Sequence, residues 1–189
     1  MILLVGNGPS VGDKPLGSLI DTYEVVRFNQ FRTDLYTPFS GTKFDWWFVN
    51  SDAATIKIAS TTTFKPTKGV VYIPGKLDKG RNADLLKKNH NNVVVYDKAV
   101  IEVLKRENHN IMPTTGFFGI HYFLTIVKEP KVVIHGYDLL KGPIDKHYFK
   151  EVPCHISGHR TETSGEKTKI LKWMMEEKVL LLEEHNDTT

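Results

Sequence analysis

The stretch ILLVGNGPS, residues 2–10, decides the fold of this chain. An apolar run of strand length ends at Gly6, and a helix-like segment follows the turn. Glycine allows a sharp turn and lets the backbone approach a ligand closely. Free N–H groups at the start of a helix favour an anion, typically a phosphate. The stretch therefore predicts the first strand of an α/β fold, followed either by a nucleotide-binding turn or by an ordinary turn capped by Ser10.

The dinucleotide fingerprint Gly-x-Gly-x-x-Gly matches this turn poorly. Val11 stands where the third glycine is expected. The next strand candidate, residues 23–28, should end in an acidic residue that binds the ribose of NAD, but it is followed by Asn29 and Gln30. NAD is therefore disfavoured. An NADP-dependent oxidoreductase stays open as an alternative, because Arg27 could meet a 2′-phosphate.

Composition places the chain among globular proteins with one substantial core. It has 189 residues, a net charge of +3 and scattered basic residues, which is no footprint for nucleic acid and suits a small anionic ligand. The lone cysteine, Cys154, excludes an internal disulfide framework and a cysteine-based zinc site. No stretch approaches the length of a membrane span, and no secretory signal is visible at the start. We therefore expect a cytoplasmic protein without a membrane span.

Strand-like apolar runs recur along the chain, and several are solidly β-branched or aromatic rather than alternating. Such runs are typical of strands that are covered on both faces. They occupy residues 2–5, 23–28, 46–50, 70–73, 93–96, 132–135 and 179–182. Helix-like segments lie between them at residues 78–89, 98–107, 114–129 and 166–178. This alternation predicts a Rossmann-like α/β fold, with a mostly parallel twisted sheet and helices on both faces. The absence of a linker or repeat predicts a single domain over residues 1–189.

Polar residues gather where the predicted strands end. Asn7, Asn29 and Asn50 each lie just past one of three successive strands, and Gly136 and Asp138 follow a later one. Ligands of open α/β sheets bind at the carboxyl ends of the strands. One such asparagine can be a simple turn former, but three beside a glycine turn predict a polar rim that binds a base, a ribose or a phosphate. Residues 31–45 and 139–165 fit neither a helix nor a strand, and long irregular segments are often functional.

Taken together, the motifs resemble those of sialyltransferases, above all the compact bacterial lipooligosaccharide-type enzymes, with similarity also to the animal and viral ones. The resemblance covers about residues 1–175. It is carried by GNGPS at residues 6–10, VRFNQF at 26–31, FVN at 48–50, PTTG at 113–116, IHGYD at 134–138, HYF at 147–149 and CHISGH at 154–159. These motifs stand in the order that the family has.

The resemblance implies an inverting, metal-independent transfer from CMP-sialic acid to a glycan that ends in a galactoside. It implies that His159 is the general base and that Tyr148, with His147, assists the departure of CMP. The residues implied for the donor site are Gly6, Asn7, Gly8, Ser10, Asn29, Asn50, Thr114, Thr115, Gly116, Gly136 and Asp138.

This chemistry is coherent from the residues as well. A histidine titrates in the range needed to remove a proton from an acceptor hydroxyl, and tyrosine, histidine and backbone donors can stabilise a departing phosphate. No Asp-x-Asp stands where a metal-dependent transferase would hold its ion. Met112 and Pro113 replace the family's arginine, which leaves the acceptor and a related donor such as CMP-Kdo open. A non-catalytic nucleotide-binding module also stays open, and Asp138 could merely cap a turn.

Overall fold

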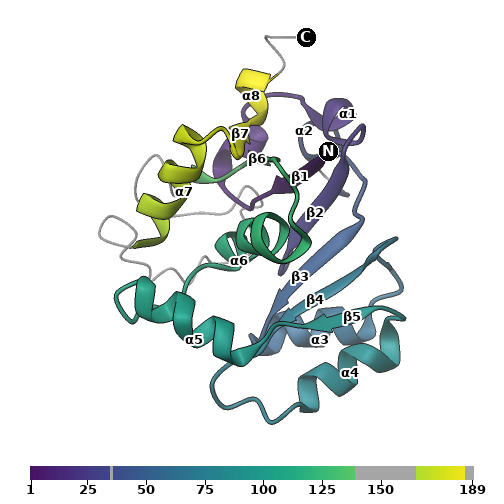
Figure 1. The fold of residues 1–189 in the computed structure, drawn as a ribbon. Coiled ribbons are helices and arrows are strands. Elements are labelled where there is room, and N and C mark those ends of the chain that lie inside the picture. Colours follow the sequence, from purple (N-terminus) through teal and green to yellow (C-terminus); the bar gives the residue numbers. More distant parts are fainter. Residues whose placement is uncertain (35, 139–164, 186–189) are drawn as a thin grey trace.

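The structure is a computed structural model and describes residues 1–34, 36–138 and 165–185. Its strands form one seven-stranded sheet in the order β5-β4-β3-β2-β1-β6-β7, and every pair is parallel (Figure 1). The strands are β1 (Ile2–Val5), β2 (Glu24–Phe28), β3 (Trp46–Asn50), β4 (Gly69–Ile73), β5 (Val93–Val95), β6 (Val132–His135) and β7 (Val179–Leu181). The predicted α/β class and parallel sheet are confirmed, and each predicted strand lies within one residue of its observed bounds at either end.

Helices alternate with these strands as βα repetition requires. The longer ones are α3 (Ala53–Thr61), α4 (Arg81–Asn89), α5 (Lys98–Glu107), α6 (Thr115–His121), which continues as the π-helix η2 (Tyr122–Val127), and α7 (Gly165–Met175). The short ones are the 3₁₀-helix η1 (Pro9–Gly12), α1 (Gly17–Ile20), α2 (Thr37–Ser40) and α8 (Leu182–His185). The four helices expected after residue 77 are present. Asp97 caps α5 and Thr114 caps α6, each through a side-chain oxygen that accepts backbone N–H groups.

Helix α3 and the helical turn α2 are not predicted by the sequence patterns. Helix α3 is rich in threonine and isoleucine, which lose side-chain freedom in a helix, and its apolar residues form no strong stripe. Asp52 nevertheless starts it, because its carboxylate accepts the N–H groups of Ala54 and Thr55 at 3.0 Å each. Burial of Ile56 and Ala59 against the sheet then holds it in place.

Both faces of the sheet are covered, which explains the solidly apolar strands. One face packs against α5, α6, η2 and α7, with Phe48, Phe118 and Trp173 in its core. The other face packs against η1, α1 and α8 near β1 and β6, and against α3 and α4 near β3 and β4. Figure 1 shows α5, α6 and α7 grouped on one side of the sheet, with α3 and α4 beneath β4 and β5. The predicted covering of both faces is confirmed.

The strand order reverses between β1 and β6. From β1 the chain adds strands in one direction as far as β5, and then returns to place β6 and β7 on the other side of β1. Because all strands are parallel, their carboxyl ends share one edge, and a crevice opens where the order reverses. The turn at residues 6–10 lies at this point.

Candidate functional site at the carboxyl edge of the sheet

The turn after β1 is built on close backbone contacts with the end of β6. The N–H of Gly6 donates to the carbonyl of His135 at 2.8 Å, and the N–H of Gly8 donates to the carbonyl of Gly136 at 3.0 Å. A Cβ atom on Gly6 would lie 2.4 Å from the carbonyl oxygen of Gly136, and one on Gly8 would lie 2.1 Å from a carboxylate oxygen of Asp138. Gly136 itself has a φ of +70°, a conformation that favours glycine. These glycines are required by packing, whatever ligand the turn binds.

Ser10 does not cap the turn, so that simpler expectation is wrong. The residue that precedes η1 is Gly8, and no side chain caps this helix. Instead, the backbone N–H of Ser10 donates to Oδ2 of Asp138 at 2.9 Å. Asp138, which is largely buried, therefore holds the turn after β1 to the end of β6. This contact fits the alternative in which Asp138 caps a turn instead of binding a ligand.

Asn7 joins the same turn to the end of β2. Its side-chain Nδ2 donates to the carbonyls of Phe28 and Gln30 at 3.1 and 3.0 Å. Both protons of the amide are thus used on the backbone that surrounds Asn29. This places Asn7 and Asn29, predicted from separate motifs, beside one another at the sheet edge.

Asn29 links three of the predicted donor-binding segments. Its Oδ1 accepts the N–H of Asn50 and its Nδ2 donates to Oγ1 of Thr115, each at 3.0 Å. Its backbone has a φ of +48°, in the left-handed region that asparagine tolerates better than most residues. The ends of β2 and β3 and the start of α6 therefore meet at this one side chain.

Thr114 starts α6 and is held from α7. Its Oγ1 accepts the N–H of Phe117 at 3.1 Å, while its own N–H and hydroxyl donate to the carboxylate of Glu166 at 2.9 and 2.5 Å. Burial raises the pKa of Glu166, and the hydrogen bonds from Thr114 oppose that rise. The N–H of Glu166 is in turn bound by Oδ1 of Asn108 at 2.7 Å.

Gly116 lies under the ring of Tyr137, with room for no side chain of its own. A Cβ at Gly116 would lie 3.0 Å from the Tyr137 ring, whose hydroxyl donates to the carbonyl of Gly116 at 3.2 Å. Burial, and then the nearby charge of Glu166, raises the pKa of Tyr137 well above its ordinary value. This tyrosine is therefore a neutral donor at neutral pH.

The structure thus brings together all the residues that were predicted for the donor site, because hydrogen bonds or van der Waals contacts connect them along one edge. The predicted catalytic residues His147, Tyr148 and His159 lie outside the described residues. Within residues 1–34, 36–138 and 165–185, no three His, Cys, Asp or Glu side chains are grouped so that they could hold a metal ion.

Arg27, on which the NADP alternative depends, is 1% exposed. Its guanidinium donates to the carbonyl of Ser40 at 2.5 Å and to that of Lys43 at 3.1 and 3.2 Å. A side chain that is buried in this way serves the backbone of residues 40–43 and does not reach a phosphate at the sheet edge. The hypothesis of an NADP site therefore loses its anchoring residue.

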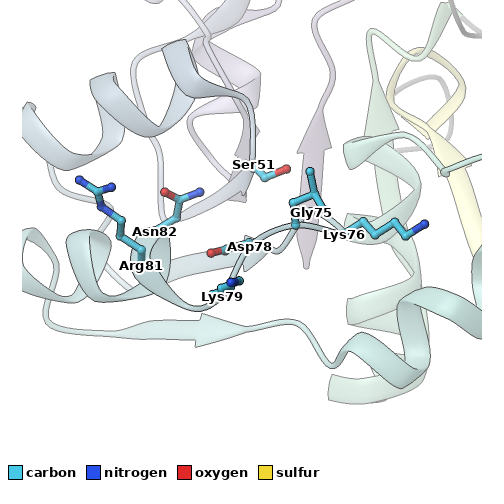
Figure 2. A pocket seen from close by; sticks show the side chains of 8 residues that line it. Ser51, Gly75, Lys76, Asp78, Lys79, Arg81 and Asn82 are labelled. Atoms are coloured by element: carbon cyan, nitrogen blue, oxygen red, sulfur yellow. The ribbon is translucent and has the colours of Figure 1, made fainter.

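Sequence patterns missed Glu166 as the partner of Thr114, and Tyr137 as the cover of Gly116. A glutamate 52 positions away gives no local signal for such a contact. They also missed a pocket of about 580 Å³ beyond Asn50, between the ends of β3 and β4, where Ser51, Lys76 and Arg81 are among the lining residues (Figure 2). The sequence signal that could have indicated this pocket is a glycine beside a lysine, which occurs twice after the strand at residues 75–76 and 79–80.

No protein-family model matches the sequence, and no curated protein sequence matches it. Solved structures do match. A mammalian sialyltransferase in complex with Gal-β-1-3GalNAc-ortho-nitrophenol aligns with a TM-score of 0.67 and 18% identity, over 96% of this chain and 68% of that one. A second structure of a mammalian sialyltransferase aligns with a TM-score of 0.65 and 17% identity, over the same shares. No helix in the described ranges is long and apolar enough to cross a membrane. The chain therefore has the α/β fold seen in sialyltransferases, with a seven-stranded parallel sheet.

Proposed function

We propose that this chain is a sialyltransferase-like glycosyltransferase of a single domain and that it is of the bacterial lipooligosaccharide type. One observation carries the proposal. The residues that the sialyltransferase resemblance assigns to the donor are connected by hydrogen bonds or van der Waals contacts along the sheet edge that includes the point where the strand order reverses. The fold aligns with that of a mammalian sialyltransferase over 96% of the chain.

In this proposal the turn at residues 6–10 and the start of α6 bind the CMP moiety. The start of α6 suits a phosphate, because the first N–H groups of a helix have no partner within the helix. The N–H groups of Gly8 and Ser10 instead hold the turn against Gly136 and Asp138. Asn50 at the end of β3 suits the ribose or the cytosine, because its Nδ2 can donate a hydrogen bond. Asn7 and Asn29 fix the backbone around the site through the bonds already described.

The proposed transfer is inverting. The acceptor hydroxyl oxygen forms a bond to the anomeric carbon of the sugar while the bond from that carbon to the phosphate oxygen breaks, and CMP leaves with the electron pair. His159 takes the proton of the acceptor hydroxyl, and Tyr148 and His147 donate hydrogen bonds to the departing phosphate. The Gal-β-1-3GalNAc acceptor of the related structure makes a galactoside the first acceptor to test.

Thermal stabilisation by CMP, set beside UDP, AMP and NADP⁺ at equal concentration, tests the donor site, because a ligand that binds the folded state raises the unfolding midpoint. We expect a shift with CMP alone. A shift with NADP⁺ and none with CMP would refute the transferase proposal.

Transfer from CMP-N-acetylneuraminate and from CMP-Kdo to a panel of galactosides then tests the reaction. His159→Ala should abolish turnover while the shift with CMP is kept. Parent protein that binds CMP but transfers neither sugar to any acceptor would be a nucleotide-binding module instead of an enzyme.

A further inference from the structure

A second pocket opens on the same edge of the sheet as the proposed donor site. It lies where β3 and β4 end, and Ser51, which lines it, directly follows Asn50. Its volume of about 580 Å³ is in the range of small-molecule sites, about 300–1,000 Å³. Neighbouring strands are about 4.8 Å apart, so the ends of β3 and β4 are displaced along the sheet by roughly 10–14 Å from the end of β1. The pocket therefore adjoins the proposed donor site at Asn50 and extends away from the turn after β1.

Three of the eight residues that line this pocket are cationic, namely Lys76, Lys79 and Arg81. The lining holds one carboxylate, that of Asp78. That carboxylate is already engaged, since Oδ1 accepts the N–H of Gly80 at 2.9 Å and Oδ2 accepts the hydroxyl of Tyr72. Across the part of the chain that the structure describes, the three cationic side chains have no ion pair or hydrogen bond. The pocket thus offers positive charge to a ligand.

The wall of the pocket is fixed before any ligand binds. The hydroxyl of the buried Tyr72 accepts Nδ2 of Asn82 at 3.2 Å as well as donating to Asp78, and Nζ of Lys98 donates to the carbonyl of Asp78 at 2.7 Å. These contacts anchor Asp78, in the loop between β4 and α4, to β4 and to the start of α5. A pre-formed wall lowers the cost of ordering a site on binding.

The glycine that follows β4 keeps space for a hydroxyl. A Cβ atom at Gly75 would lie 2.4 Å from Oγ of Ser51. Figure 2 shows Arg81 and Asn82 on one side of the pocket and Lys76 extending to the opposite side. Because the charges are spread in this way, the pocket suits an extended polar ligand with an acidic group better than it suits a compact ion.

We infer that this pocket binds an acidic sugar of the acceptor glycan through its carboxylate or phosphate group. The ligand's identity as an acceptor rests on the proposed function, whereas the preference for an acidic sugar rests on the pocket alone. Hydroxyl and amide groups from Ser51 and Asn82 suit the sugar hydroxyls, and the cationic side chains suit the acidic group.

Calorimetric titration of the full chain at about 50 mM salt, where exposed charges are little screened, tests the inference. The probes are 3′-sialyllactose for a carboxylate, galactose 6-phosphate for a phosphate and lactose as the neutral sugar. The test variant is Lys79→Gln/Arg81→Gln. The matched control, Lys87→Gln/Lys88→Gln, also removes two positive charges, but from exposed positions in the last turn of α4 that do not line the pocket.

We expect at least one acidic probe to bind the parent and the control variant with equal affinity. The same probe should bind the test variant at least tenfold more weakly. Lactose should bind the parent far more weakly than that probe does. The probe that binds identifies the acidic group. Three results would overturn the inference: an acidic probe that binds the test variant and the control with equal affinity, lactose that binds the parent as tightly as the acidic probes, or no binding of either acidic probe to the parent. A CMP titration of the same proteins keeps the two proposals separate. If CMP binds but the acidic probes show no preference for the parent over the test variant, only the inference about the pocket is overturned. If the acidic probes show that preference but CMP does not bind, only the proposed donor site is overturned.

Discussion

The carboxylate of Glu166 accepts both the N–H and the hydroxyl of Thr114, at 2.9 and 2.5 Å. Thr114 precedes the first turn of α6, and Thr115 in that turn is bound by Asn29. Glu166 thereby fixes, from α7, the end of the helix that the proposed function places against CMP. It is a positioning residue in this proposal, since its carboxylate acts on the site through Thr114.

Replacement of Glu166 should reveal this role. Glu166→Ala leaves the buried N–H and hydroxyl of Thr114 without their acceptor, which costs about 1–3 kcal/mol of the free energy of unfolding. Glu166→Gln keeps one acceptor and should cost less. Urea denaturation at pH 7 measures both losses, with exposed Glu102→Gln in α5 as the control that should change the free energy of unfolding little.

The stability difference between the parent and Glu166→Gln should depend on pH. Burial raises the folded-state pKa of Glu166 above its ordinary value of 4.5, so the folded chain binds this proton more tightly than the unfolded chain does. The resulting stabilisation is present in full below pH 4.5 and is lost as the pH rises through the folded-state pKa. The parent should therefore lose stability relative to Glu166→Gln between pH 4.5 and 7. An advantage of the parent that grows over that range would contradict this assignment.

Gly8 and Gly12 form a matched pair within one turn. A Cβ atom at Gly8 would lie 2.1 Å from Oδ2 of Asp138, whereas one at Gly12 would meet nothing within 4 Å. Gly8→Ala should cost about 1–3 kcal/mol of the free energy of unfolding through overpacking and should weaken CMP binding. Gly12→Ala should change neither. Thermal unfolding with and without CMP measures both effects, and equal losses in the two variants would show that the contact with Asp138 does not restrain the turn.

The sequence was sufficient to predict the sheet because burial on both faces leaves a plain signal. Runs such as residues 70–73 and 132–135 are apolar without interruption, and turn residues mark where they end. The polar rim was predictable for the same reason, since Asn7, Asn29 and Asn50 each follow a recognisable strand. Parallel strands then bring such residues to one edge.

Contacts between distant segments were not predictable in this way. The bond from the N–H of Ser10 to Asp138 spans 128 positions, and the one from the N–H of Thr114 to Glu166 spans 52; neither has a local pattern. Ser10 has the residue type of a cap, but tertiary contact with Asp138 decides its role. Arg27 has the residue type of a phosphate ligand, but it is buried and bonds the carbonyls of Ser40 and Lys43.

Asn29 should show both a conformational and a binding effect. Its φ of +48° is strained for alanine and free for glycine, so Asn29→Ala should be less stable than Asn29→Gly by about 1 kcal/mol. Both variants lose the bonds to Asn50 and Thr115, so in this proposal both should bind CMP roughly tenfold more weakly than the parent, which corresponds to about 1.4 kcal/mol. Chemical denaturation and calorimetric titration separate the two effects. Unchanged CMP affinity in Asn29→Gly would remove Asn29 from the donor site.

His121 at the end of α6 should make the fold sensitive to acid. Burial, and then the charge of Lys169, lowers the pKa of His121 to about 4, and its Nδ1 lies 2.5 Å from the hydroxyl of Tyr96. Because the unfolded chain protonates this ring near pH 6.5, the stabilisation is present above pH 6.5 and is lost as the pH falls through about 4. His121→Gln should flatten this dependence, and should cost about 1 kcal/mol at pH 7 through its weaker bond to Tyr96. Urea midpoints at pH 7, 5.5 and 4.5, with exposed His109→Asn as the control, measure the effect. An equally steep loss of stability in His121→Gln would assign the acid sensitivity to other groups.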